Sequence, residues 1–311
     1  MKKKICLIGY NYGKNVLINS INEINSFKLI GVCGLKVRKS YHLLNYNYYN
    51  SWQKMIKELK PDIVVIAVPP LEQIKIIKYL LNNKIQFFCQ KPIANNLNDI
   101  NRFIKLNNQL RKKNLIDLNF LSIPAIIKFK KIIKKININD IETKIDVIWN
   151  FNPLSRSLKN SWKNNKNKLG GEINNFFFHL ISILYFLFRI KKMNFIKLEN
   201  DKYYFKLYIK NNKINVIFDP NNNKNLISIT LRNKKYVYQL ENKSKDYHNN
   251  FVIKKNSSII FKKNFPNKKS RIYASKILLK LFLTNNKDID KFTNFEFGLM
   301  LQKEIIKLNV I

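Results

Sequence analysis

Residues 4–15, KICLIGYNYGKN, decide the fold of this chain. The apolar run 5–8 ends at Gly9, and Gly13 opens a helical pattern of apolar residues, so the stretch predicts a strand, a tight turn and a helix. Such a turn lets the backbone approach a pyrophosphate, and the helix N-terminus offers unpaired N–H groups. The full fingerprint is G-x-G-x-x-G; here Asn11 replaces its second glycine and Gly13 comes one residue early. On this stretch alone, a strand-turn-helix without a cofactor stays open.

The rest of the first half alternates between apolar, strand-like runs and helical patterns. The strand-like runs are residues 27–33, 63–68, 85–89 and 115–120. The helical patterns are residues 52–59, 71–81 and 98–110. Strands that alternate with helices predict βαβ units and a parallel sheet, an α/β domain of the Rossmann type.

Small and turn-forming residues stand where the predicted strands end. Gly9, Gly34, Pro69-Pro70 and Lys91-Pro92 each follow one of these strands. Ligands of open parallel sheets bind beyond the carboxyl ends of the strands. We therefore expect a cofactor cleft lined by Gly9, Asn11, Gly13, Pro69, Pro70 and Lys91.

The second half has a different order of elements. A helical pattern at residues 124–133 and an alternating run at 144–149 precede Gly170, Gly171 and a strongly apolar helix. Further strand-like runs are residues 203–209, 214–218, 226–231, 236–240 and 258–262, and the last helical patterns are 273–282 and 295–308. Runs of strands with helices at the ends predict an α+β domain with an antiparallel sheet. We expect a nucleotide-binding domain at residues 1–120 and an α+β domain at 121–311.

The chain of 311 residues carries a formal net charge of +39, which first suggests a nucleic-acid partner. Only seven of its 58 basic residues are Arg, the residue that grips bases and phosphates bidentately, and the lysines are spread along the whole chain. An aromatic cluster (Tyr46, Tyr48, Tyr49 and Trp52) is better explained by packing of a short βα segment than by base stacking. The sequence therefore argues against a specific nucleic-acid partner.

Three cysteines, Cys6, Cys33 and Cys89, lie inside apolar runs and form no C-x-x-C motif, which is typical of buried thiols in a reducing compartment. The apolar run after the first lysines is too short for a signal sequence. The longest apolar run, residues 176–188, is short for a membrane span and suits a buried helix. These observations predict a cytoplasmic protein without a membrane partner.

Four stretches in order resemble the Gfo/Idh/MocA oxidoreductases, relatives of glucose-fructose oxidoreductase and inositol dehydrogenase. GYNYGKN, residues 9–15, is similar to a GYGYWGKN-type opening with one residue lost. AVPPLEQ, residues 67–73, resembles A-T-P-P-x-x-H, and QKP, residues 90–92, resembles E-K-P. SWKNNKNKLGGEINNFFFH, residues 161–179, resembles a tryptophan-containing loop that leads into G-G-G-x-L-x-D-x-G-x-H. The resemblance implies an NAD(P)-binding Rossmann domain followed by an open-faced antiparallel sheet domain.

The chain departs from these motifs at several positions. Asn11 replaces the middle glycine of the fingerprint, Gln90 replaces the glutamate of E-K-P, Asn175 replaces the aspartate and Leu169 replaces the first helix glycine. Lys91 and His179 are retained. The resemblance implies catalytic roles for Lys91, His179 and Asn175.

Oxidation of a secondary alcohol by a nicotinamide needs a protein group that takes the hydroxyl proton, because the cofactor takes the hydride. Histidine side chains ordinarily titrate near neutral pH, so His179 is the predicted acceptor, while Lys91 would polarise the substrate oxygen. Asn175, one turn before His179, can orient a hydroxyl but cannot act as a base. A core histidine at position 179 stays open, and we interpret His42 and His248 as surface residues.

Many NAD-binding units place an acid after the second strand to hold the ribose hydroxyls. Here Gly34 stands at that place, followed by Lys36, Arg38 and Lys39, which suits a 2′-phosphate and favours NADP over NAD. The predicted cofactor-binding residues are Gly9, Asn11, Tyr12, Gly13, Gly34, Arg38, Pro69, Pro70, Gln90 and Lys91. No metal site is predicted.

The function that this resemblance implies is an NAD(P)-dependent oxidoreductase acting on a CH–OH or keto group of a sugar, sugar nucleotide or cyclitol. The alternative is a degraded relative that binds a nucleotide or sugar without turnover, as a binding or regulatory protein. The exchanges at positions 11, 34 and 175 favour that alternative. A homo-oligomer formed through the C-terminal sheet is compatible with either function.

Overall fold

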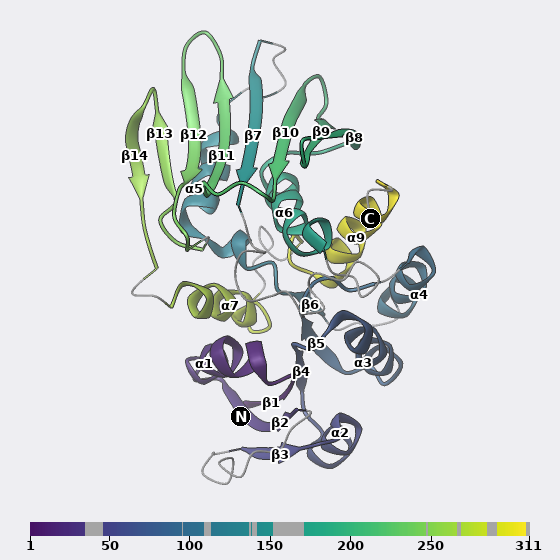
Figure 1. Ribbon diagram of the computed structural model, residues 1–311. Coiled ribbons are helices and arrows are strands. Elements are labelled where there is room, and N and C mark those ends of the chain that lie inside the picture. The colour runs from purple at the N-terminus through teal and green to yellow at the C-terminus, as the bar shows by residue number, and fades with distance from the viewer. Residues whose placement is uncertain are drawn as a thin grey trace. The chain divides into compact units, whose positions relative to one another are not determined.

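The computed structural model describes residues 1–34, 46–94, 96–108, 113–136, 138, 142–151, 171–246, 248–265, 269–284 and 291–308. The chain forms two compact units (Figure 1). The first comprises Met1–Asn119 and Arg271–Lys303, and the second comprises Phe120–Ser270 and Glu304–Ile311. The segment Arg271–Lys303 therefore groups with the N-terminal half, which no feature of the sequence had indicated.

The first unit is built on a six-stranded sheet with the order β3-β2-β1-β4-β5-β6, and every pair in it is parallel. Its strands are β1 (Lys3–Ile8), β2 (Phe27–Cys33), β3 (Asn47–Tyr49), β4 (Ile63–Ile66), β5 (Gln86–Cys89) and β6 (Leu115–Ile116). The strand order reverses between β1 and β4, which is where open parallel sheets bind their ligands. The predicted Rossmann-type domain is confirmed.

Helices cover both faces of this sheet. Figure 1 shows α1 (Ile18–Asn22) and α7 (Ser270–Lys280) on one face, and α2 (Trp52–Leu59), α3 (Pro70–Asn82) and α4 (Leu97–Asn108) on the other. Leu278, Leu279 and Leu281 join the same buried cluster as Leu7 of β1, so the returning segment completes the core on the α1 face. Most of α9 (Phe295–Lys307) also belongs to this unit.

Local sequence explains where two of these helices begin. The Ser51 side chain accepts a hydrogen bond from the backbone N–H of Lys54 and caps α2. Pro70 is the first residue of α3, where the missing N–H of proline costs no hydrogen bond. Three residues of the aromatic cluster take part in packing: Tyr46 and Tyr48 lie against the buried core, and Trp52 of α2 lies edge-on against Tyr79 of α3 with ring centroids 5.0 Å apart.

The second unit contains an eight-stranded sheet with the order β14-β13-β12-β11-β7-β10-β9-β8 (Figure 1). Its strands are β7 (Lys144–Asn150), β8 (Lys192–Glu199), β9 (Lys202–Tyr208), β10 (Lys213–Asp219), β11 (Leu226–Arg232), β12 (Val237–Asn242), β13 (Val252–Lys255) and β14 (Ser258–Lys262). Two helices, α5 (Pro124–Ile133) and α6 (Phe178–Leu187), accompany it. The predicted α+β domain is confirmed.

One pair in this sheet differs from the predicted antiparallel arrangement. β10 runs parallel to β7, whereas the other neighbours are antiparallel. The chain leaves β7 for α6 and re-enters the sheet through the β8-β9-β10 meander, so β10 reaches β7 through a crossover instead of a hairpin, as parallel pairs require.

Alternation along β7 shows which face of the sheet carries the core. Ile145, Val147 and Trp149 are each 1% exposed, while the residues between them are half-buried or exposed. The predicted alternation is therefore correct, and it orients one face of β7 toward the apolar interior of this unit.

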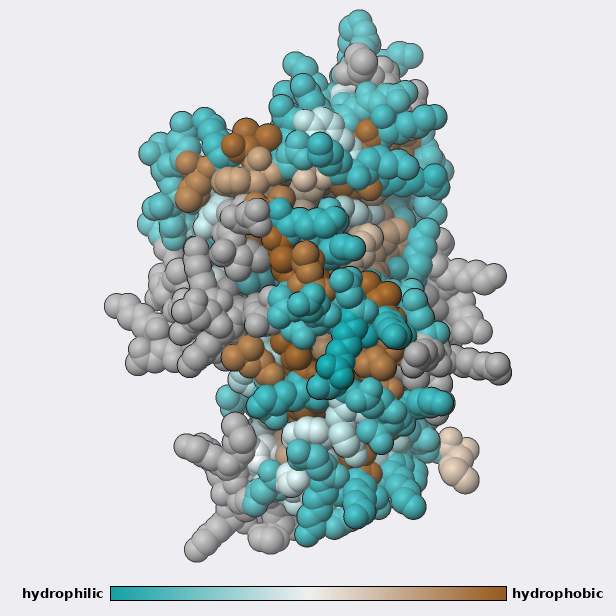
Figure 2. All heavy atoms as spheres, turned by 90° about the vertical axis from the view of Figure 1, so that its right-hand side faces the viewer, coloured by the Kyte–Doolittle hydropathy of each residue, from teal (hydrophilic) through white to brown (hydrophobic). Residues whose placement is uncertain are grey.

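The described residues expose few large apolar side chains. They are Met1, Leu71, Leu97, Ile196, Leu198, Ile259, Ile260 and Leu283. Figure 2 shows hydrophilic side chains over much of the face it draws, with smaller apolar areas between them. No helix in the described part of the chain is long and apolar enough to cross a membrane.

The three cysteines are buried free thiols, as predicted. Burial raises the pKa of the Cys33 thiol to about 11 and, with the charge of Cys33, that of Cys6 to about 12. Thiols with such pKa values remain protonated near neutral pH and react poorly.

Candidate functional site

The turn after β1 requires glycine for two different reasons. Gly9 has φ +105°, and a Cβ there would lie 2.2 Å from the carbonyl oxygen of Ala67. At Gly13 a Cβ would lie 2.8 Å from a methyl group of Leu7, so this glycine lets the helix pack closely on β1. Asn11, which replaces the middle glycine, is exposed. The turn therefore keeps its sharp bend and its helix–strand contact.

The helix that follows this turn begins with a π-helical segment, Gly13–Leu17, and continues as α1. The second unit contains the same feature: a π-helical segment, Ile173–Phe177, directly precedes α6. π-Helical turns are rare and occur often at functional sites. The helix after the Gly9–Gly13 turn and the helix that carries His179, both predicted to take part in the function, each begin with a π-helical turn.

Tyrosines occupy the space at the end of β2. A Cβ on Gly34 would lie 2.6 Å from the Tyr48 hydroxyl oxygen and 3.2 Å from the Tyr10 Cβ. The two tyrosine rings pack edge to face with centroids 6.4 Å apart. A side chain at position 34 would therefore require the Tyr48 hydroxyl group to move. The basic residues Lys36, Arg38 and Lys39, predicted to hold a 2′-phosphate, lie outside the described residues.

The turn after β5 holds Gln90 and Lys91 and is fixed by side chains from other elements. Gln73 of α3, which is 1% exposed, donates its amide N–H groups to the carbonyl oxygens of Gln90 and, at 2.8 Å, of Pro92. Its oxygen accepts the Gln90 backbone N–H at 3.2 Å. The Lys91–Pro92 peptide bond is cis, and Lys91 itself is partly exposed. Lys91 therefore stands on a clamped turn at the carboxyl edge of the sheet.

The predicted proline pair starts the neighbouring helix at the same edge. Pro69 is exposed and Pro70 is buried as the first residue of α3. The backbone N–H of Ala67, just before them, donates to the carbonyl oxygen of Ile8 at 2.7 Å. The ends of β1 and β4 thus lie side by side, which places the proline pair next to the Gly9 turn.

A buried acid at this edge, Asp117, was not predicted from the sequence. The Gln90 side-chain amide donates to its carboxylate, as do the hydroxyl groups of Tyr12 and Ser275, at 3.4 and 3.3 Å. Asn119 in turn donates to the Tyr12 hydroxyl at 3.5 Å. The sequence pattern had extended the last strand to residue 120. β6 in fact ends at Ile116, so Asp117 directly follows it.

Burial raises the pKa of the Asp117 carboxyl group to about 6, while donors from Gln90, Ser275 and Tyr12 and the charge of Lys91 act in the opposite direction. Burial and the charge of Asp117 also raise the pKa of the Tyr12 hydroxyl. Near neutral pH this edge therefore contains an ionised carboxylate beside a protonated tyrosine.

The second unit carries Asn175 and His179 on one helix. Asn175 is 3% exposed and donates from its side-chain amide to the carbonyl oxygen of Gly171 at 3.0 Å. The His179 ring is partly exposed and packs against Phe120 with centroids 5.1 Å apart. Gly171 has φ +83°, whereas Gly170 lies outside the described residues. The expected approach of His179 to Lys91 stays a prediction.

His248 is buried, and its interpretation as a surface residue is wrong. Only 6% of it is exposed, and its ring lies 4.5 Å from the ring of Phe120. The polar residues around His248 predict an exposed loop, but their side chains bind the loop's own backbone instead of facing water. Asn242, for example, donates to the carbonyl oxygen of Asn249 at 2.6 Å. His42 lies outside the described residues.

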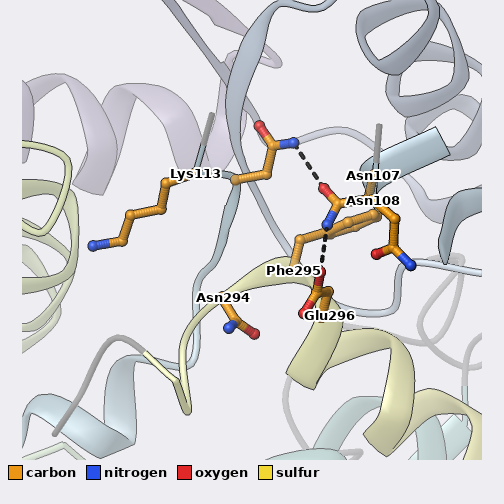
Figure 3. Close-up of a pocket in the computed structure, with 7 residues that line it drawn as sticks. Asn107, Asn108, Lys113, Asn294, Phe295 and Glu296 are labelled. Carbon is orange, nitrogen blue, oxygen red and sulfur yellow. Dashed lines mark hydrogen bonds between the residues drawn. The ribbon is translucent and has the colours of Figure 1, made fainter. Parts of the chain in front are cut away.

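A separate polar pocket of about 300 Å³ lies at the opposite edge of the first sheet, where strands begin (Figure 3). Its lining residues are Asn107, Asn108, Lys113, Asn114, Asn294, Phe295 and Glu296. Asn114 donates to Asn107, which donates to Glu296. Lys113 donates to the carbonyl oxygens of Leu281 and Thr284, and none of the lining residues was predicted to take part in catalysis.

Residues 3–117 match the family model described as "Oxidoreductase family, NAD-binding Rossmann fold", GFO_IDH_MocA. This domain belongs to the Gfo/Idh/MocA family. The resemblance inferred from the four motifs is confirmed. No curated protein sequence matches the chain significantly.

Solved structures similar to the whole chain include members with different roles. The transcriptional regulator Gal80p from Kluyveromyces lactis aligns with TM-score 0.78 and 15% identity over 99% of this chain and 89% of that one. The dehydrogenase MviM from Clostridium difficile gives 0.72 and 16%, covering 99% of each chain. The WlbA dehydrogenase from Chromobacterium violaceum, in complex with NADH and UDP-GlcNAcA, gives 0.74 and 14%, covering 99% and 92%. At these identities the likeness shows a shared two-domain fold.

Proposed function

We propose that this protein is an NAD(P)-dependent oxidoreductase that transfers a hydride between the nicotinamide and a hydroxyl or keto group of a sugar, sugar nucleotide or cyclitol. The observation that carries the proposal is the pairing of a Gly9–Gly13 turn with a clamped Lys91 turn at one edge of a family-type NAD-binding sheet. An enzyme of this class needs both a pyrophosphate turn and a cation for the substrate oxygen.

The dinucleotide would lie across the carboxyl edge of the sheet. Gly9 and Gly13 keep the turn close to the ends of β1 and β4, so the start of the following helix would face the pyrophosphate. Gly34 brings no carboxylate to the ribose end that would repel a 2′-phosphate, so the proposal favours NADP over NAD. The bound cofactor supplies the hydride acceptor or donor.

The chain's own residues would supply the proton chemistry. The Lys91 ammonium donates a hydrogen bond to the reacting oxygen and lowers the energy of its developing negative charge. His179 accepts the hydroxyl proton, and its partly exposed ring can pass that proton to solvent. Asn175 orients the substrate hydroxyl without taking a proton.

The second candidate is a protein that binds a nucleotide or sugar without turnover. Gln90 and Asn175 are neutral where the family motifs are acidic, and the similarity to a transcriptional regulator shows that this fold also serves regulation. We further propose a cytoplasmic protein with a carbohydrate-type ligand and self-association through the eight-stranded sheet.

A hydride-transfer assay distinguishes the two candidates. NADPH and NADH oxidation, and the reverse reaction, are followed at the nicotinamide absorbance with a panel of sugars, sugar nucleotides and cyclitols. The enzyme proposal expects turnover with at least one of them, lost in Lys91→Met but retained in a matched surface variant, Lys78→Met. Cofactor binding without turnover on the whole panel would favour the second candidate.

A further inference from the structure

The buried carboxylate of Asp117 lies at the centre of the candidate cofactor edge. β5 and β6 are parallel neighbours with Cys89 opposite Ile116, so Gln90 and Asp117 are the first residues beyond each strand. The backbone N–H of Asp117 donates to the carbonyl oxygen of Cys89 at 2.8 Å, and Asp117 is fully buried. Its side chain therefore stands directly beside that of Gln90.

The described partners of this carboxylate all donate hydrogen bonds to it. Gln90 donates an amide N–H, and Tyr12 and Ser275 donate hydroxyl groups. An ionised carboxylate accepts hydrogen bonds and donates none, so the geometry fits the charged form. A pKa near 6 agrees, since the group is then mostly ionised at pH 7.5.

Two motif exchanges converge on the same place. Gln90 replaces the glutamate of E-K-P, and Gln73 stands where A-T-P-P-x-x-H has its histidine. Both amides now bind the 90–92 turn or Asp117. Position 90 is therefore neutral where the motif is acidic, and the carboxylate of Asp117 lies one strand away, within hydrogen-bond reach of the Gln90 side chain.

We propose that Asp117 supplies, from the neighbouring strand, the carboxylate that the E-K-P motif lacks at position 90. Asp117 is then a positioning residue: it orients the Gln90 amide and acts as the counter-charge of Lys91. This inference rests on the proposed function, in which Lys91 contacts the substrate oxygen. A neutral residue at 117 would be easier to bury, because an ionised group loses its hydration unless a charge or donors replace it. Lys91 provides that charge.

Residue-resolved acylation tests the charge coupling without substrate or cofactor. The full-length protein is labelled with a trace amine-reactive ester at pH 8, and peptide mass spectrometry gives the rate at each lysine. Removing a nearby negative charge leaves more of an amine unprotonated, so Asp117→Asn should label Lys91 roughly 3- to 10-fold faster. Lys78, exposed on α3, is the internal control and should not change.

Variants that place the carboxylate at position 90 instead of position 117 make the test more specific. Gln90→Glu alone places two carboxylates together and should slow the labelling of Lys91. The double variant Gln90→Glu/Asp117→Asn again has one carboxylate and one amide, so it should return Lys91 labelling to within about 2-fold of the wild-type rate. If Asp117→Asn does not fold, comparison of the double variant with Gln90→Glu gives the same contrast.

Turnover is measured on the same variants. Asp117→Asn should lower kcat more than it raises KM for the cofactor, and the double variant should recover at least 10-fold over the weaker single variant. Unchanged Lys91 labelling in Asp117→Asn, or a double variant no better than either single, overturns the inference. A protein with the expected labelling pattern but no hydride transfer would refute the proposed function and leave the charge relocation standing.

Discussion

The two candidate regions of this protein are held by different forces. At the sheet edge of the first unit, Gln73, Gln90 and Asp117 fix their surroundings through directed hydrogen bonds. In the second unit, His179 and His248 are held by ring packing on Phe120. A hydrogen-bonded network loses stability when a single donor or acceptor atom is exchanged, whereas packed rings lose stability when side-chain volume is removed. The first region should therefore be sensitive to isosteric changes and the second to truncations.

The largest effect is expected when the second region loses its proton acceptor. His179→Ala should lower kcat by roughly 10²–10⁴-fold, the usual range for a lost general base, with little change in cofactor affinity. His248→Ala is the matched control, because it removes an imidazole from the same phenylalanine without removing the acceptor. Steady-state kinetics on folded protein compare the two. Equal losses of kcat in both variants would show that His179 only packs.

In the first region, the backbone turn should be less tolerant than the side chains around it. Gly9→Ala would place a Cβ against a carbonyl oxygen in a positive-φ turn, so we expect a loss of about 3 kcal/mol in the free energy of unfolding. Gly13→Ala meets a movable Leu7 methyl group and should cost about 1 kcal/mol. Urea denaturation measures both. If Gly13→Ala were the more damaging variant, the close approach of Gly9 to Ala67 would not limit the turn.

The buried acid makes the stability of the first region depend on pH. The folded-state pKa of Asp117, about 6, lies above its ordinary value of 3.8, so the folded protein binds the proton more tightly. The free energy of unfolding therefore falls as pH rises through this window and is fully reduced above the folded pKa. Between pH 4.5 and 7.5 the wild type should lose about 2 kcal/mol relative to Asp117→Asn, which cannot titrate. Parallel denaturation curves for both proteins across this range would contradict the shifted pKa.

The ribose end should show a smaller, cofactor-specific effect. If NADP is the cofactor, Arg38→Ala should weaken NADPH binding by roughly 1–3 kcal/mol and NADH binding far less, as expected for a lost charge-assisted hydrogen bond. Lys78→Ala on the exposed side of α3 is the control. Isothermal titration of each variant with both nucleotides gives the comparison. Equal weakening of both nucleotides would remove the NADP preference from the account.

The sequence predicts correctly those elements whose residues have strong backbone preferences of their own. Gly9 and Pro70 mark a sharp turn and a helix start regardless of their partners, and the structure confirms both. The sequence does not mark Asp117, because the apolar pattern around it continues to residue 120 although β6 has only two residues. His248 was misjudged because polar loop composition does not reveal that the loop's amides bind one another. Contacts between distant segments carry no local signal.

The same reason explains two missed strands, the edge strand β8 and the inner strand β13, which lies between β12 and β14. β8 carries three lysines or glutamates among exposed residues, and β13 ends in two lysines, so neither shows a clean alternation. Both segments are strands because β8 forms backbone hydrogen bonds with β9 and β13 forms them with β12, although neither sequence alternates clearly between apolar and polar residues. Edge strands commonly carry charged side chains, which prevent unwanted pairing but also hide the strand pattern.

The central claim is that a dinucleotide binds at the Gly9–Gly13 turn, and calorimetric titration with NADPH and NADH tests it most directly. We predict one binding site per chain, with tighter binding of NADPH than of NADH. It also predicts that Asn11→Asp, which puts a negative charge where the pyrophosphate would lie, weakens both nucleotides at least about 10-fold. The exposed Asn19→Asp, at the far end of the same helix, should bind as the wild type does. No binding of either nucleotide, or equal binding by Asn11→Asp and the wild type, would contradict the claim.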